Sequence, residues 1–482
     1  MMARSTGTAR VFTYAALLLP IALCADHAAG QRTLAPQVRG FVRTAAAVIA
    51  LTNVHVIDGT GASPKEKQTL VLRDGTIEFV GDAASARVPA GAEVIDLDGH
   101  TVMPGFVMLH EHMFYPAGNA MYNTLGYSFP RLYLAGGATT IRTGGSMMPY
   151  ADLNLKRAID AGSIPGPKMH VTAPYLNGPG LGIPGVKALR GPADARTMLA
   201  YWADEGFTSF KTYMHISRDE LRAVVEEAHA RGLKVTGHLC SVTYREAATI
   251  GIDNLEHGFF ASTDFVSGKQ ADRCPQGASA SLTDLDVRSE AAQSLIRALV
   301  DAGVAITSTL TVFETSVPGR PRAPDGALDA MVPETRDAYL RQFSRISTDT
   351  SSTAPQRFRR MMAMEVAFAR AGGLLVAGTD PTGYGGVVAG FANQRQIELL
   401  IEAGFTAVEA IRIGTLNGAI HLGVDDRVGS IVAGKAADLV VVRGNPVTRA
   451  ADVRNVTIVF KDGVAWDPER LIASARGLVG LR

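Results

Sequence analysis

The chain has 482 residues, 47% of them hydrophobic, which is enough to bury a large core and to form more than one domain. Its 47 Lys and Arg residues are balanced by 46 Asp and Glu residues, so the formal net charge is only +1. Because no basic stripe is present, we expect no nucleic-acid partner, and a small molecule is the expected substrate or ligand.

Residues 1–30 have the pattern of a secretory signal peptide. Two arginines precede the apolar stretch Ala15–Leu23, and small residues up to Gly30 offer a cleavage point. The stretch is shorter than the roughly 20 residues that span a bilayer, so we interpret it as a cleaved signal and not as a transmembrane helix. No transmembrane segment is expected after its removal. We therefore predict a periplasmic or secreted protein. Lipid attachment at Cys24 is less favoured, because Leu23 is larger than the residue that usually precedes a lipid-modified cysteine.

The two ends of the chain share a β-like texture. In residues 41–104, apolar and polar residues alternate in short segments such as QTLVLRDGTIEFVG, which contain or end in Asp-Gly turns. The same texture returns in residues 425–470, with ADLVVVRGN and VTIVFKDGV. Each end is too small to hold a core alone and would leave open strand edges. We therefore predict that the two segments pair into one small β-sandwich.

Residues 105–424 alternate apolar, β-branched runs with helical patterns. The clearest helix is predicted over Arg218–Gly232, where apolar residues recur at helical spacing before a terminal glycine. The strand candidates are GFVMLH, ATTIRTGG, KMHVTAP, TSFKTYM, LKVTGHL, DNLEHGF, VAITSTL and LLVAGTD. Eightfold alternation of strands and helices predicts an α/β fold, specifically a (β/α)8 TIM barrel with a parallel inner sheet.

Chemically capable side chains stand at the ends of these strands. In PGFVMLHEHMF, His110 and His112 are two residues apart, so both point to one strand face while Glu111 faces away. A lone histidine in an apolar strand is usually a core residue, but the C-terminal ends of barrel strands meet at one rim, where active sites form. Repetition at several strand ends therefore predicts a metal site. The other candidates are Arg142, His170, Lys211, His238, His257 and Asp380.

The order His-x-His, Lys, His, His, Asp resembles the amidohydrolase superfamily, in particular the imidazolonepropionase-like and prolidase-like metal-dependent hydrolases. The segments LDGHTVMPGF, NLEHG, GTDP and GSIVAGKAADLVVVRGNP support this resemblance, which covers roughly residues 48–467. It implies a binuclear metal centre. By this resemblance, one metal is held by His110, His112 and Asp380, the second by His238 and His257, and a carboxylated Lys211 bridges the two.

The chemistry of the donors agrees with that implication. An unmodified lysine has no acceptor and cannot ligate a cation, so an unmodified Lys211 would leave a site with one metal. Imidazole and carboxylate donors favour zinc, while manganese and cobalt stay open. The resemblance implies that a metal-bound hydroxide attacks the substrate carbonyl. Asp380 would act as general base and then as general acid, passing the proton to the leaving nitrogen.

Some positions depart from the family pattern or are open to two interpretations. Met108 and Thr143 stand where the family usually has Asp, and the change at Met108 removes an acceptor that could orient the ligands. Substrate contacts are predicted for Tyr213, which shares a strand face with Lys211, and for Arg142 and His170. Arg142 would bind a substrate carboxylate, and a bond to a neighbouring loop is its favoured alternative. The alternative for Tyr213 is packing under a loop, and for His170 a position inside the barrel rim.

The expected activity is hydrolysis of a C–N amide bond in a dipeptide, an Xaa-Pro substrate or an N-acyl amino acid. Cyclic amides, lactones and other esters are open to the same attack and form the alternative. A non-catalytic binding barrel is disfavoured, because all six ligand positions of the family are filled. A homo-oligomer stays open, as does pairing of Cys240 with Cys274, which an oxidising compartment allows.

Overall fold

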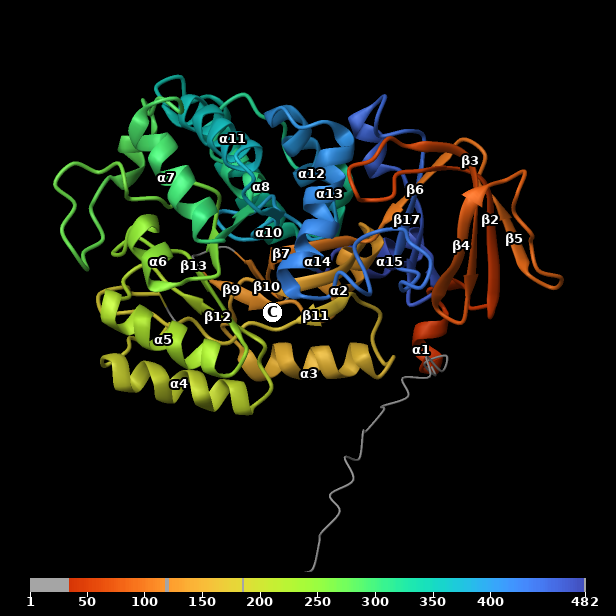
Figure 1. The fold of residues 1–482 in the computed structure, drawn as a ribbon, viewed down its shortest axis with the longest axis horizontal. Coiled ribbons are helices and arrows are strands. Elements are labelled where there is room, and N and C mark those ends of the chain that lie inside the picture. The colour runs from red at the N-terminus through yellow and green to blue at the C-terminus, as the bar shows by residue number, and fades with distance from the viewer. Residues whose placement is uncertain (1–33, 118–120, 184–185, 481–482) are drawn as a thin grey trace, which may run out of the picture.

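The computed structural model describes residues 34–117, 121–183 and 186–480. The predicted signal peptide and Cys24 lie outside these residues. The described chain has a helix-rich part and a strand-rich part, the latter at the right-hand end of Figure 1. Among the described helices, none combines the length and apolar character needed to cross a bilayer.

Both ends of the chain contribute to one nine-stranded sheet. Its strands are β1 (Val42–Thr44), β2 (Val48–Val56), β3 (Lys65–Arg73), β4 (Thr76–Asp82), β5 (Glu93–Asp96), β6 (His100–Pro104), β17 (Leu439–Arg443), β18 (Val456–Lys461) and β19 (Val464–Trp466). The N-terminal and C-terminal strands meet where β6 pairs with β17, antiparallel, with Val102 opposite Val441. Both valines are fully buried in the core of this sheet. The pairing of the two ends is thus present, while the boundaries of the predicted sandwich stay a prediction.

All eight strand candidates of the middle segment form strands. They are β7 (Phe106–Glu111), β10 (Ala138–Thr143), β11 (Lys168–His170), β12 (Ser209–Thr212), β13 (Lys234–Gly237), β14 (Asn254–Glu256), β15 (Ala305–Ser308) and β16 (Leu375–Ala377). They pair in parallel in two sheets, in the orders β11-β10-β7 and β12-β13-β14-β15-β16. The predicted α/β class is therefore confirmed.

Two contacts connect these sheets at their edges. After β11, Thr172 forms a parallel bridge with Ser209, the first residue of β12. After β16, the backbone N–H groups of Thr379 and Asp380 donate to the carbonyl oxygen of His110 in β7, at 3.1 and 2.9 Å. Each end of the five-stranded sheet is thus joined to an edge strand of the three-stranded sheet.

Helices follow most of the parallel strands. Along the chain they are α1 (Pro36–Arg39), α2 (Ser128–Ala135), α3 (Pro149–Asp160), α4 (Pro192–Asp204), α5 (Arg218–Ala230), α6 (Tyr244–Ile250), α7 (Glu290–Asp301), α8 (Leu310–Glu314), α9 (Asp325–Ala330), α10 (Pro333–Ser347), α11 (Ala354–Arg370), α12 (Phe391–Ala403), α13 (Ala407–Gly414), α14 (Leu416–Leu422) and α15 (Pro468–Ala475). Two 3-10 helices, η1 (Ala278–Leu282) and η2 (Ala450–Arg454), and a hairpin of β8 (Phe114–Pro116) and β9 (Tyr122–Thr124) complete the described elements.

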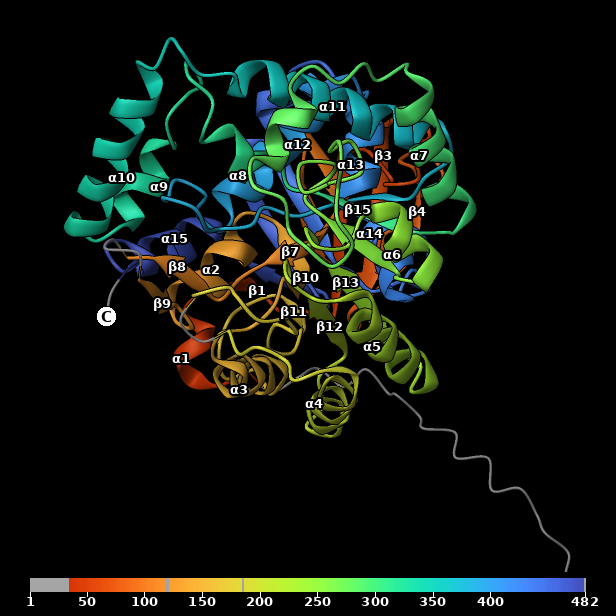
Figure 2. The same cartoon turned by 90° about the vertical axis from the view of Figure 1, so that its left-hand side faces the viewer.

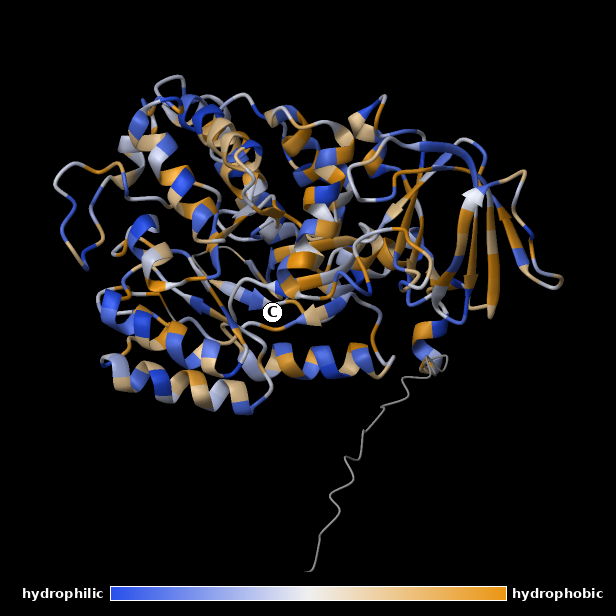
Figure 3. Ribbon diagram, viewed as in Figure 1, coloured by the Kyte–Doolittle hydropathy of each residue, from blue (hydrophilic) through white to orange (hydrophobic). Residues whose placement is uncertain are grey.

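The helix predicted over Arg218–Gly232 is α5. Ser217 and Glu220 form a capping box, in which each side chain accepts a hydrogen bond from the other residue's backbone N–H, and this explains where the helix begins. Figure 3 shows hydrophilic and hydrophobic residues alternating along α3, α4 and α5, the pattern of helices that pack one face on a sheet.

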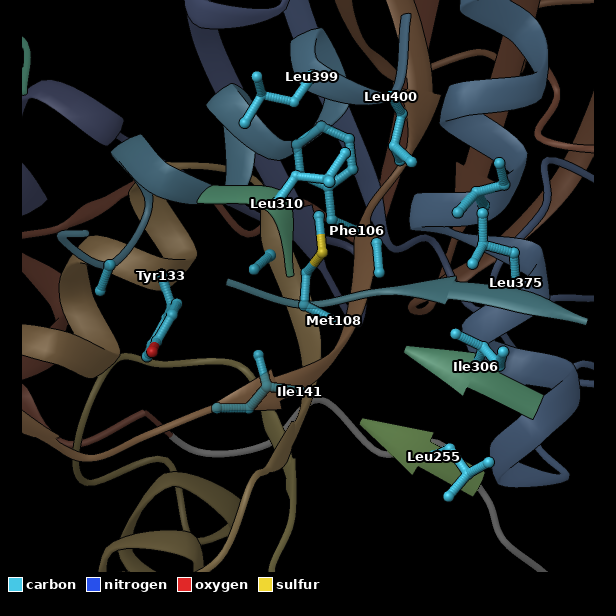
Figure 4. Close-up of a cluster of buried hydrophobic side chains, with 14 of the residues drawn as sticks. Phe106, Met108, Tyr133, Ile141, Leu255, Ile306, Leu310, Leu375, Leu399 and Leu400 are labelled. Carbon is cyan, nitrogen blue, oxygen red and sulfur yellow. The ribbon is translucent and has the colours of Figure 1, made fainter. Parts of the chain in front are cut away.

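The core lies between the parallel strands and these helices. Figure 4 shows Phe106, Ile141 and Ile306 from three different strands, together with Leu310 from α8 and Leu400 from α12. All five side chains are fully buried. Burial of such side chains contributes about 1.5–3 kcal/mol each, so this packing fixes the strand ends that carry the polar residues.

A disulfide joins Cys240, after β13, to Cys274, in the long segment after β14, with 4.8 Å between the Cα atoms. The pairing that the sequence left open is therefore present in the structure. It ties together two segments that follow neighbouring parallel strands.

Gly378 makes the closest approach between β16 and β7. A Cβ atom at this position would lie 2.5 Å from the Cβ of His110 and 2.6 Å from its backbone nitrogen. We expect Gly378→Ala to lower the free energy of unfolding by about 1–3 kcal/mol, because the two strands would have to separate. Chemical denaturation followed by circular dichroism measures this change.

The matched control is Gly40→Ala. Gly40 has a φ of −61° and no atom within 4 Å of the added Cβ. We expect it to change the stability by less than about 0.5 kcal/mol. Equal stability of the two variants would contradict the tight contact at Gly378.

Candidate active site

A β-bulge in β7 directs the two histidines of the His-x-His motif. Met108 is opposite Ile141 and Glu111 is opposite Thr143, so three steps along β7 match two steps along β10. A bulge of this kind changes the direction of the side chains that follow it. His110 and His112 are both buried, with 1% of their surface exposed.

Asp380, after β16, lies beside both histidines. Its Oδ1 is 3.2 Å from His112 Nε2 and 3.6 Å from His110 Nε2. One candidate ligand atom from each of the three residues lies within 4.8 Å of the others, a spacing that could hold a metal ion. The carbonyl oxygen of Gly145 is 3.3 Å from His112 Nδ1, so the ring presents its Nε2 to Asp380.

The other three predicted ligands join the same cluster. Lys211 Nζ lies 3.2 Å from His110 Nε2. The ring centroids of His257 and His110 are 4.5 Å apart, and those of His238 and His257 are 4.4 Å apart. Side chains from the ends of five strands, separated by up to 270 positions in the sequence, therefore meet in one place. Their role as metal ligands stays a prediction.

The backbone is strained at two of these positions. His257 has a φ of 69° and Asp380 a φ of 54°, in the left-handed region that residues with side chains rarely adopt. Such conformations cost of order 1–3 kcal/mol each and are concentrated at functional sites. Asp380 Oδ2 lies 3.7 Å from His257 Nδ1, so the two strained residues face each other.

The protonation states suit a cation. Burial lowers the pKa of His112 to about 4 and that of His238 to about 3, so both imidazoles are neutral at pH 7 and have a free lone pair. Burial opposes ionisation of Asp380, but His110 and His112 hold its pKa well below the usual range. Neutral imidazoles and an ionised carboxylate are the forms that bind metals. The residues therefore fit a divalent ion.

His110 and Lys211 depend on the same surroundings. Burial and the charge of Lys211 lower the pKa of His110, but the carboxylates of Glu256 and Asp380 outweigh them and raise it. A cation among these groups would supply the positive charge that a proton on His110 supplies otherwise. Burial lowers the pKa of Lys211 to about 8, which leaves a larger fraction of its amine neutral than in water.

Glu256 was missed by the sequence analysis. Its side chain is fully buried, and Oε2 lies 2.7 Å from His110 Nδ1. Its Oε1 accepts hydrogen bonds from Arg142 Nη2 at 2.6 Å and from Thr236 Oγ1 at 2.5 Å. A carboxylate behind a ligand histidine fixes which ring nitrogen faces the metal. The signal in the sequence was an acidic residue directly before His257 in an apolar strand.

Arg142 lies beneath the cluster, with 2% of its surface exposed. Besides Glu256, it donates to the carbonyl oxygen of Leu109 at 2.8 Å and to Asn254 Oδ1 at 3.0 Å. The predicted contact with a substrate carboxylate is untested, but the structure gives this guanidinium a different set of partners. It neutralises Glu256 and joins β7, β10 and β14.

The other two predicted substrate residues differ in position. The Tyr213 ring is half-buried beside the cluster, 5.0 Å from the His238 ring and 4.9 Å from the Tyr175 ring. His170 is in register with Arg142 on the neighbouring strand. Its pKa is lowered to about 4 by burial and by surrounding cations, of which Lys156 acts most strongly. The geometry thus favours Tyr213 over His170 as a residue that faces a bound substrate.

Glu111 faces away from its two histidine neighbours, as the strand periodicity predicts. It accepts hydrogen bonds from Thr379 Oγ1 and, at 2.9 Å, from Asn393 Nδ2. Burial raises its pKa to about 7. Glu111 therefore links β7 to the residue before Asp380 and to α12, and holds the opposite side of the strand.

The chain is similar in sequence to known proteins. A family model described as "Amidohydrolase family" matches residues 101–465. A segment of 93 residues is 39% identical to an imidazolonepropionase of Nocardia farcinica (strain IFM 10152), which covers 19% of this chain and 23% of that protein. The match thus spans about a quarter of the relative's length.

Several solved structures have the same fold. A prolidase-like protein of Bifidobacterium longum is 26% identical, with a TM-score of 0.65, over 89% of this chain and 98% of that chain. Bottromycin amidohydrolase is 23% identical, with a TM-score of 0.67, over 92% and 96%. A Xaa-Pro dipeptidase with bound methionine is 19% identical, with a TM-score of 0.65, over 87% and 100%. The last two likenesses show the fold alone.

The buried pair of Glu256 and Arg142 generates a stability prediction. We expect Glu256→Gln to lower the free energy of unfolding at pH 7 by about 3–5 kcal/mol, because the buried guanidinium loses its charged partner. Arg142 and His110 hold the pKa of Glu256 below its ordinary value of 4.5 despite burial. The stabilisation is therefore present above that ordinary value and is lost as the pH falls towards the folded-state pKa.

Denaturation at a series of pH values measures both effects, and the gap between the native protein and the variant should narrow in acid. Glu226→Gln is the control, because Glu226 is exposed and pairs with Arg196 at 2.5 Å on the surface. Its effect should stay below about 1 kcal/mol. A pH-independent gap for Glu256→Gln would contradict the role of its charge.

Proposed function

Because the chain belongs to the amidohydrolase family, we propose that it is a metal-dependent hydrolase that cleaves C–N amide bonds. The observation that carries the proposal is the convergence of His110, His112 and Asp380 within 4.8 Å, at strand ends far apart in the sequence. We also propose that the eight parallel strands close into a (β/α)8 barrel, which the contacts from Thr172 to Ser209 and from Asp380 to His110 support.

The metal centre is proposed to be binuclear, with zinc favoured by its imidazole and carboxylate donors. His110, His112 and Asp380 would hold one ion, and His238 and His257 the other. When bound, such ions activate water and polarise a substrate carbonyl. The protein contributes the arrangement of the donors, which the packed strands, the bulge in β7 and Glu256 hold in place.

Lys211 is proposed to be carboxylated and to bridge the two ions. The neutral amine is the form that attacks carbon dioxide: a C–N bond forms as one C–O π bond opens onto oxygen, the nitrogen gives a proton to water, and the product is an anionic carbamate. Two features support this reaction. The side chain is 2% exposed, and its pKa is lowered to about 8 by burial. A carbamate provides oxygens, whereas an ammonium group has no acceptor.

Asp380 is proposed to move the proton during hydrolysis. Its carboxylate is ionised at neutral pH and faces the imidazoles, so it can accept a proton from the attacking water and deliver it to the leaving nitrogen. Tyr213, half-buried beside His238, is proposed to donate a hydrogen bond to the substrate carbonyl.

The proposed substrates are dipeptides, Xaa-Pro substrates and N-acyl amino acids. The support comes from the names of the similar structures, a prolidase-like protein and a Xaa-Pro dipeptidase. A periplasmic or secreted location is proposed from the pattern of residues 1–30, and the disulfide between Cys240 and Cys274 agrees with an oxidising compartment.

The central test compares three variants of the purified protein. We expect His110→Ala to lose bound metal and amide hydrolysis together, and Asp380→Asn to lower kcat by about 10²–10⁴-fold, the usual contribution of a proton-transfer group. His229→Ala is the matched control, since His229 is exposed on α5 and pairs with Asp253. Metal content by mass spectrometry and hydrolysis of a panel of dipeptides and N-acyl amino acids are the readouts.

Amide hydrolysis that persists in His110→Ala after the metal is lost would refute the assignment. A second panel of lactones and cyclic amides tests the alternative. If only these compounds react, the bond class changes and the site assignment stands.

Carboxylation of Lys211 has its own spectroscopic test. After incubation with ¹³C-bicarbonate, the native protein should show a carbamate carbon signal in ¹³C NMR, and Lys211→Gln should not. We expect Lys211→Gln to bind fewer metal ions, because the bridging anion is missing. The same carbamate signal in both proteins would place the label elsewhere and contradict this role.

A further inference from the structure

A separate cavity of about 270 Å³ lies between the segment that follows β15 and helices α12 and α15. The elements around it are α8, the stretch before α9, α10, α12 and α15, and Figure 2 shows α8, α9, α10 and α15 on the same side of the molecule. Among the described residues, none of the six predicted metal ligands lines this cavity. It is therefore a candidate site outside the metal cluster.

The walls of this cavity are largely apolar. They include Val317, Ala323, Tyr339, Val387 and Ile472, from four separate parts of the chain. The first four of these side chains are buried, and Tyr339 stacks on Tyr384 with ring centroids 5.8 Å apart. Ligand pockets in proteins are mostly apolar concavities with a few polar groups, and an apolar cavity of 150 Å³ is enough to bind benzene.

Four arginines and Glu314 are the charged residues that line the cavity, and each arginine is paired with a carboxylate. Arg322 donates to Asp325 at 2.7 Å and Arg454 to both oxygens of Glu398 at 2.5 Å. Arg320 donates to Glu314 at 2.7 Å and to both oxygens of Glu402 at 2.7 Å. Arg395 donates to Glu314 at 2.6 Å and to Glu398 at 2.7 Å. An ionic ligand would have to displace one of these partners, whereas an uncharged ligand leaves every pair intact. The charge pattern therefore selects an uncharged occupant.

One wall of the cavity is also a support of the metal cluster. The cavity contacts Thr311 and Glu314 of α8. Thr311 Oγ1 donates to the carbonyl oxygen of Thr379, the residue before Asp380, at 2.9 Å. Thr309, directly before α8, has its Oγ1 2.9 Å from His257 Nδ1. A molecule that contacts α8 thus touches a segment whose side chains contact His257 and the residue before Asp380.

We propose that this cavity binds an uncharged, largely apolar or aromatic small molecule, and that its occupation changes the rate of hydrolysis through α8. None of the predicted metal ligands or predicted substrate residues, all of which the structure describes, lines the cavity, so we expect its ligand not to compete with substrate and its effect to appear in kcat. Binding itself does not depend on the proposed hydrolase activity, because the cavity and the metal cluster have no residue in common.

The experiment uses the neutral fluorescent probe N-phenyl-1-naphthylamine with the purified protein. We expect saturable binding at one site per chain. Ala323→Phe and Ile472→Trp enlarge lining side chains from two separate parts of the chain and should each weaken binding at least tenfold, which corresponds to about 1.4 kcal/mol. Ile420→Trp is the matched control, because Ile420 is 38% exposed on α14 and does not line the cavity. It should bind the probe like the native protein.

Circular dichroism and metal content establish whether each variant is folded. If one of the two filling variants does not fold, the other still tests the site. Equal binding by all three variants would overturn the site. Displacement of the probe by substrate would overturn its separation from the metal cluster, and an unchanged kcat at saturating probe would overturn the coupling through α8. If no amide is hydrolysed at all, the binding result still decides the site independently of the proposed function.

Discussion

The rest of the site depends on the hydrogen bonds and ion pairs that the buried carboxylate of Glu256 forms. Its two oxygens have different partners: Oε2 faces His110, and Oε1 accepts hydrogen bonds from Arg142 and Thr236. A buried charge is tolerated only when it is paired and hydrogen-bonded, and these three partners satisfy that condition. The result is a fixed imidazole ring at the base of the cluster, with its Nε2 directed to Lys211 and Asp380.

The cluster is held from both sides of β7. On one side the bulge directs His110 and His112 into the site, and on the other Glu111 anchors the strand to Asn393 of α12. The glycine after β16 lets that strand approach the backbone of His110, which brings Asp380 within reach. The left-handed backbone of His257 and Asp380 is maintained by this surrounding structure, because that conformation is less favourable than a right-handed or extended one for both residues.

The segment after β15 connects the cluster around His110 and Asp380 to the proposed second site. Thr309 and Thr311 contact the cluster side through His257 and Thr379, while Glu314 and Val317 face the cavity. A short helix with partners on both sides can transmit a small displacement, provided that it has two arrangements whose balance each ligand changes. The proposed regulation would therefore act through α8, which lies outside the motifs of the predicted metal ligands.

The amino-acid sequence by itself determined the eight strands and helix α5, because these depend on local periodicity. Its resemblance to a known family pointed to that family and to the six residues that meet at the cluster. The sequence also placed Glu111 on the opposite face from His110, by the two-residue period of a strand. The tertiary structure alone decided that Glu256 orients His110, that Arg142 neutralises Glu256, that Cys240 pairs with Cys274 and that a cavity lies beside α8. Each of these features joins residues far apart in the chain, and no local pattern records which side chains packing will bring together.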